Sequence, residues 1–97
     1  MALQRYIIER DIPQVGALKP QELAGAAGKS NAALNELAPK VQWLESFVAA
    51  DKTFCVYLAA DEAAIRRHAE LSGFPASKIT PISKIIDPTT ERASATT

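Results

Sequence analysis

Histidine and cysteine, residue types that often act as bases, nucleophiles or metal ligands, each occur once, as His68 and Cys55. His68 lies in the stretch RRHAELSGFP at helical spacing from Ile65 and Ser72, so we expect it to point inward or toward the rim of the sheet. It could be a base or ligand acting near neutral pH, or a partly buried imidazole that hydrogen-bonds a backbone carbonyl or a carboxylate. Because there is no second histidine, the sequence favours the structural role.

Cys55 and Tyr57 alternate on one strand and therefore share one side of it. No neighbouring cation favours a thiolate at Cys55, so we interpret it as a small buried hydrophobe. Tyr57 is the better pocket residue, because it combines ring area with a hydroxyl. If Trp43 and Glu45 share its side, they form an aromatic wall with one carboxylate, which suits a small organic molecule. The alternative is that all three pack in a subunit interface.

Metal and cofactor motifs are missing from the sequence. Nickel or zinc sites use several imidazoles or thiolates, whereas this chain offers one of each with no local spacing between them. P-loop, Rossmann, nucleophile-elbow and zinc patterns are also absent. We therefore predict no metal ligands and no cofactor, and the sequence identifies no catalytic residue.

The composition excludes several kinds of partner. Lysine plus arginine and aspartate plus glutamate both number 11, so no basic field is present to attract nucleic acid. No apolar run reaches the roughly 18 residues of a membrane helix, and no charged segment followed by an apolar run indicates a secretory signal. We expect a cytoplasmic protein that binds neither nucleic acid nor membranes.

The order of expected elements predicts the fold. Strands are expected at 3–10, 41–49, 53–59 and 78–86, the last with Pro81 at an edge or a bulge. One helix is expected from Pro20 to about Leu37, and a second from the N-cap Asp61 to Gly73. The β-α-β-β-α-β order predicts an α+β, ferredoxin-like domain, with a four-stranded antiparallel sheet and two helices on one face. Residues 1–87 form this domain, and 88–97 are expected to be a flexible C-terminal tail.

The second face of this sheet is expected to be apolar, since neither side of any strand reads as simply polar. An apolar open face usually marks an interaction site. We therefore expect a homodimer that pairs the open faces of two subunits as a dimeric α+β barrel, with a cavity between them.

Three stretches resemble a widespread bacterial family of small ferredoxin-like proteins of unknown function, some of whose members are described as nickel-binding. They are RYIIERDIP, SFVAADKTFCVYLAADEAAIRRHAELSGFPASKI and IIDPTT. The resemblance covers most of the chain, from Arg5 to about Thr90, and implies the ferredoxin-like fold and a homodimer. In nickel-binding members a histidine stands near the end of the first strand, where this chain has Arg10. Their Gly-His-Pro reads Gly73-Phe74-Pro75 here, so no metal ligands carry over.

The function expected from these observations is a small homodimeric protein that binds a small organic ligand between its paired sheets. The ligand-binding candidates are Tyr57, Trp43, Glu45, His68 and Cys55. One alternative is a cofactor-free monooxygenase or isomerase of the dimeric α+β barrel type, in which His68 or Glu45 moves a proton. Another is a nickel-binding or other transition-metal-binding protein, as in the described relatives.

Overall fold

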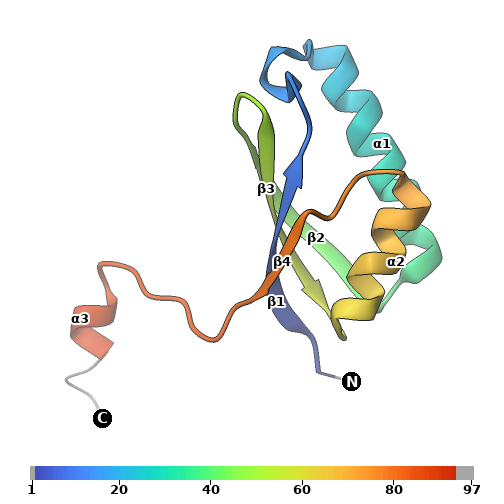
Figure 1. Cartoon of the computed structure of the whole chain (residues 1–97). Helices are drawn as coiled ribbons and strands as arrows, with labels where there is room; N and C mark the ends of the chain where they lie inside the picture. Colours follow the sequence, from blue (N-terminus) through green and yellow to red (C-terminus); the bar gives the residue numbers. More distant parts are fainter. Residues whose placement is uncertain (1, 94–97) are drawn as a thin grey trace.

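A computed structural model describes residues 2–93 as a four-stranded antiparallel sheet with two long helices on one face (Figure 1). The strand order is β2-β3-β1-β4, so β3 and β1 are the central strands and β2 and β4 are at the edges. The elements are β1 Gln4–Asp11, a 3₁₀ turn Val15–Ala17, α1 Pro20–Leu37, β2 Val41–Val48, β3 Lys52–Ala59, α2 Glu62–Ser72, β4 Lys78–Pro81 and α3 Thr90–Ala93. The predicted α+β, ferredoxin-like fold is confirmed.

Both long helices begin and end where the sequence predicts. Pro20 starts α1, and the carboxylate of Glu22 accepts a hydrogen bond from the Lys19 amide at 2.9 Å. The Asp61 carboxylate accepts the Ala64 amide at 2.9 Å and caps α2. Gly73 ends α2 at a φ of 78°, a left-handed conformation that costs glycine little.

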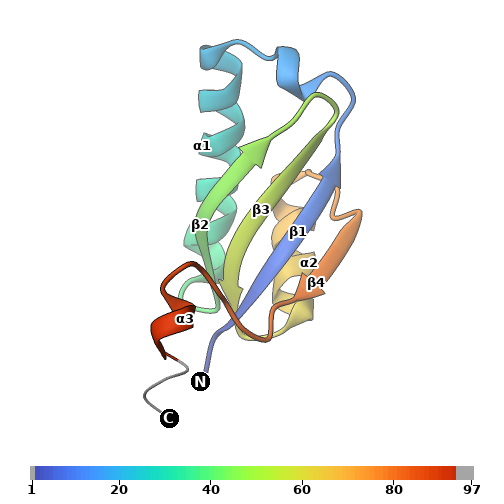
Figure 2. The ribbon, with the colours of Figure 1, turned by 90° about the vertical axis from the view of Figure 1, so that its left-hand side faces the viewer.

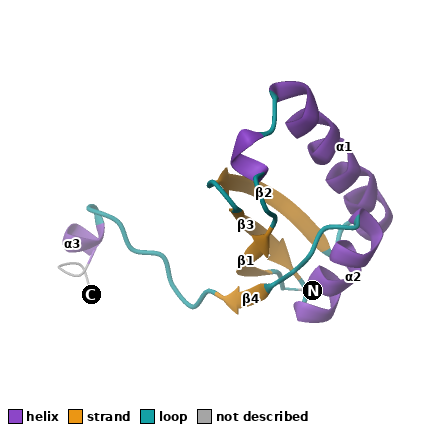
Figure 3. Cartoon of the chain, turned by 45° about the horizontal axis from the view of Figure 1, so that its top comes forward, coloured by secondary structure: helices purple, strands orange, loops and turns teal. Residues whose placement is uncertain are grey.

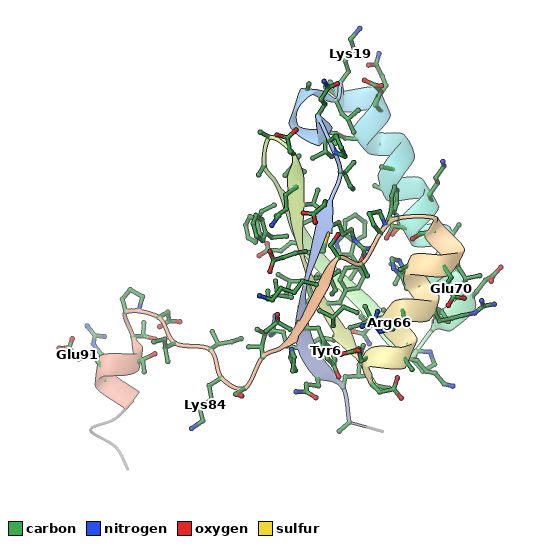
Figure 4. The ribbon with its side chains drawn as sticks, in the orientation of Figure 1. Tyr6, Lys19, Arg66, Glu70, Lys84 and Glu91 are labelled. Carbon is green, nitrogen blue, oxygen red and sulfur yellow. The ribbon has the colours of Figure 1, made fainter. Side chains whose placement is uncertain are left out.

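The outer side of α2 is charged and its inner side packs against the sheet. Figure 4 shows Arg66 and Glu70 on the side of α2 that faces away from the sheet. Ile65 and His68 are buried on the inner side, where Ile65 joins the core around Ile8 of β1. The amphipathic pattern of α2 therefore sets which of its side chains can reach a site inside the subunit.

β4 is shorter than the predicted 78–86. It pairs with β1 from Lys78 to Pro81, and the Ile82 amide still donates to the Arg5 carbonyl at 2.9 Å. Two causes end it: Pro81 has no amide hydrogen, and β1 itself begins at Gln4, just beyond this pairing. As expected for a strand with proline, β4 is an edge strand.

After β4 the chain leaves the domain on the side of the sheet opposite the helices (Figures 1 and 2). In Figure 3 the short helix α3 lies apart from both layers. The predicted tail 88–97 contains α3, and its residues 94–97 lie outside the described part of the chain. Over residues 2–93, no helix has the length and apolar character needed to cross a membrane.

Candidate functional site

A pocket of about 280 Å³ lies between α1, the 3₁₀ turn and the side of the sheet that faces the helices. Apolar side chains from α1 and from the loop before it form most of its wall. Side chains of the strands, Ser30 on α1 and Phe74 after α2 form the rest. The lining residues are Arg10, Ile12, Val15, Leu18, Leu23, Ala26, Ala27, Ser30, Trp43, Ser46, Val48, Thr53, Cys55, Tyr57 and Phe74.

Tyr57 and Trp43 form the aromatic part of this pocket, as the sequence suggested. They are directly opposite each other on β3 and β2, with ring centroids 6.5 Å apart and planes at 18°. The Trp43 indole N–H donates to the Ser46 hydroxyl at 2.9 Å, so its polar edge has a partner inside the same pocket. Tyr57 is buried, and this burial raises the pKa of its hydroxyl.

Glu45 is on the other face of the sheet, so the predicted carboxylate is not part of the aromatic wall. The pairing of β2 with β3 shifts between Trp43 and Glu45: Trp43 is opposite Tyr57, whereas Glu45 is opposite Val56. Such a bulge adds one residue to a strand and reverses the side to which the following side chains point. Glu45 is therefore exposed on the open face, and Ser46 takes the position expected for it.

The pocket is not where the sequence predicted it, which was a cavity between the paired sheets of two subunits. Tyr57, Trp43 and Cys55 are on the helix-facing side of the strands and line a pocket within one subunit. Cys55 is a buried, free thiol, 3.5 Å from the Thr53 hydroxyl. These three candidates are thus brought together, but beneath α1 rather than on the open face.

His68 lies behind the pocket, in a buried hydrogen-bonded chain with Ser30 and Tyr57. The Ser30 hydroxyl is 3.1 Å from Nε2 of His68 and 3.4 Å from the Tyr57 hydroxyl. Ser30 is therefore the partner of His68, through its hydroxyl and through a backbone hydrogen bond that raises the pKa of the imidazole, and no carboxylate takes part. Neither His68 nor Glu45, the two groups of the enzymatic alternative, lines the pocket.

Burial lowers the pKa of His68 below its ordinary value of 6.5, and the positive charge of Arg10 lowers it further. His68 is only 1% exposed, so the imidazole is neutral at neutral pH in the folded protein. In the unfolded chain it takes up a proton near pH 6.5. The stability that depends on the neutral imidazole is therefore complete above pH 6.5 and is lost as the pH falls below it.

We expect this one group to lower the free energy of unfolding by up to roughly 1 kcal/mol between pH 6.5 and pH 5.5, with a slope that approaches about 1.4 kcal/mol per pH unit as the pH falls. Urea unfolding at intervals between pH 7.5 and 5.5 measures the slope. The variant His68→Gln should lose most of it, since glutamine does not titrate. Equal slopes for the two proteins over this window would contradict the assignment.

Arg10 is the site residue that the sequence reasoning missed. It is 3% exposed, and one guanidinium nitrogen, Nη1, donates to the Pro75 carbonyl at 2.8 Å. Its Cζ lies 5.8 Å from the centre of the Tyr57 ring. The signal was present in the alternation of β1: Tyr6 and Ile8 face the core, and Arg10 follows them on the same side.

A ferredoxin-like sheet with both long helices on one face and a pocket beneath α1 defines a small α+β protein. The family model of SCO4226-like nickel responsive proteins matches residues 6–82. The chain belongs to this SCO4226-like family, which confirms the resemblance to small bacterial proteins with nickel-responsive members.

One solved structure with the same fold is SCO4226 from Streptomyces coelicolor A3(2). The TM-score is 0.71 at 14% sequence identity, over 84% of this chain and 99% of that chain. At this identity the similarity concerns the fold. No curated protein sequence matches the chain.

The donor set of this chain does not fit a nickel site of its own. Within residues 2–93, no three histidine, cysteine, aspartate or glutamate side chains gather as a potential metal site. The single imidazole, His68, also lies in the field of the Arg10 guanidinium, which disfavours a divalent cation. We therefore assign no metal ligands.

Proposed function

We propose that this protein binds a small organic ligand in the pocket beneath α1. The observation that carries the proposal is the pocket itself, with apolar walls, stacked aromatic rings and a few polar groups at one side. Sites for small molecules are commonly concave and mostly apolar, with a few polar groups that fix orientation. Its volume of about 280 Å³ suits a ligand smaller than a typical drug.

Native mass spectrometry of the purified protein tests this proposal. A protein peak that carries additional organic mass, released by denaturation, is the expected result. Titration of small aromatic and aliphatic compounds by calorimetry covers the case in which the ligand is lost during purification. Failure of every compound to bind, together with a bare protein peak, would contradict the proposal.

We also propose that the protein acts as a homodimer through the open face of the sheet. Phe47 and Phe54 are paired across β2 and β3 on this face, and Phe47 is 57% exposed. The segment after β4 leaves on the same side and carries Ile85 and Ile86, the latter 78% exposed (Figure 1). A second copy would cover both apolar surfaces, its segment lying over the phenylalanines of the first. Lys84, which directly precedes the two isoleucines in the sequence and is labelled in Figure 4, would remain at the rim.

The variant Ile86→Glu tests the dimer without touching the core, because this side chain makes little contact within its own subunit. We expect dimerisation to weaken by roughly tenfold or more, since burial of one isoleucine contributes about 1.5–3 kcal/mol. Analytical ultracentrifugation over a range of concentrations measures it. Leu71→Glu on α2 is the control, because Leu71 is exposed on the helix layer. A wild-type monomer at all concentrations, or equal dimerisation of Ile86→Glu, would contradict the dimer.

A further inference from the structure

Arg10 is a buried cation with no acidic partner among the described residues. The ion pairs there join Lys52 to Glu9 and Asp11, Arg66 to Glu62, and Arg67 to Glu70. Its Nη1 donates to a neutral carbonyl, and its Nη2 is buried without a close hydrogen-bond partner, with the Tyr57 hydroxyl as a further polar neighbour of the guanidinium. Buried charges are normally paired, because removal of a charge from water is costly when nothing compensates it. Within residues 2–93 this charge is therefore left uncompensated.

The groups around Arg10 are all neutral. Tyr57 lies under the guanidinium with a raised pKa, and His68 has a lowered pKa, so neither carries a compensating charge at neutral pH. The polar side chains that line the pocket with Arg10 are hydroxyl groups and a thiol, from Ser30, Ser46, Thr53 and Cys55. The pocket therefore carries one net positive charge on an otherwise uncharged wall.

This arrangement selects the chemistry of the ligand. A single guanidinium complements a single carboxylate, with hydroxyls available for its remaining lone pairs. A phosphate dianion would need a second cation, which the lining does not contain. The aromatic and aliphatic remainder of the wall, from Trp43 to Leu18 and Ala27, suits an apolar body.

We propose that the pocket binds a small apolar carboxylic acid whose carboxylate pairs with the guanidinium of Arg10. This inference rests on the proposed ligand-binding function and adds the class of ligand to it. It makes Arg10 a specificity-determining residue: the charge stays unpaired in the empty protein and is paired when the acid binds.

Calorimetric titration with matched acids and amides tests the inference. The probes are phenylacetate with phenylacetamide, and hexanoate with hexanamide, which differ in charge but hardly in shape. We expect wild-type protein to bind each acid at least about tenfold more tightly than its amide, a preference of about 1.4 kcal/mol. The variant Arg10→Met should bind acid and amide alike, and Arg10→Lys should keep part of the preference.

Arg5→Met is the matched control, because Arg5 is on the same strand but on the open face, opposite Leu58. It should keep the full preference for acids. The wild-type comparison needs no variant to fold, so the inference stays testable even if Arg10→Met is unstable. Amides that bind as tightly as acids would overturn this inference alone. If no probe binds, the proposed function fails together with it.

Discussion

The variant Ala27→Trp is expected to fold as the wild type does and to bind the small acid roughly 100-fold more weakly or not at all, a loss of about 3 kcal/mol or more. Ala27 lies on α1 where the helix faces the sheet, and its side chain lines the pocket. An indole at this position fills space that the ligand needs. Because α1 keeps a helix-compatible residue there, the backbone is not disturbed.

Ala24→Trp is the matched control for this variant. Ala24 is exposed on the same helix, three residues earlier, and does not line the pocket. Calorimetry gives the affinities of both variants, and thermal unfolding followed by circular dichroism shows whether each is folded. Unchanged affinity in a folded Ala27→Trp protein would mean that the ligand binds elsewhere.

Replacement of Gly16 by alanine is expected to lower the free energy of unfolding by about 1–3 kcal/mol, as overpacking in a close contact usually does. A Cβ at this position would lie 2.6 Å from the Ala49 carbonyl oxygen and 2.8 Å from the Ala50 Cα. Both atoms belong to backbone, so a side-chain rotation cannot relieve the clash. The Gly16 amide also donates to the Ala50 carbonyl at 2.9 Å, which holds the loop before α1 against the β2–β3 hairpin.

The same substitution in α1 should have the opposite sign. Nothing lies within 4 Å of a Cβ added at Gly25 or Gly28. Both glycines are exposed, so neither is needed for a close approach of α1 to the sheet. We expect Gly28→Ala to stabilise the protein by about 0.5–1 kcal/mol through helix propensity. Urea unfolding of the two variants measures the contrast, and a stable Gly16→Ala protein would contradict the close approach.

The sequence carries most of the information that sets the fold. Capping by Asp61, the left-handed Gly73 and the proline at the start of α1 are local signals, so the helix ends are predictable from a few residues each. The start of the fourth strand was predictable from the sequence, but the residue at which it ends was not. Its end depends on where β1 begins, and this is a contact between residues far apart in the sequence.

The site was predictable only in part. The period of two along β3 placed Cys55 and Tyr57 on one side, and Trp43 was correctly grouped with them. The bulge that turns Glu45 to the opposite face contains no glycine or proline, so the sequence gives no signal of it. Arg10 was visible in the alternation of β1, but a cation at a buried position contradicts the usual hydrophobic pattern. Sequence reasoning therefore passed over the residue with the strongest electrostatic consequence.

The Ser30 hydroxyl, shared by His68 and Tyr57, also sets the direction in which the hydrogen bonds of this buried group donate. A serine hydroxyl has one hydrogen, so between His68 and Tyr57 it can donate to one neighbour while it accepts from the other. With the ring hydrogen of the neutral imidazole on Nε2, Nδ1 keeps a bare lone pair, which matches its lack of a hydrogen-bond partner. Donation then runs from His68 to Ser30 to Tyr57. The phenolic hydrogen of Tyr57 is left over at the end of this relay, free to turn toward an acceptor brought in from outside the chain.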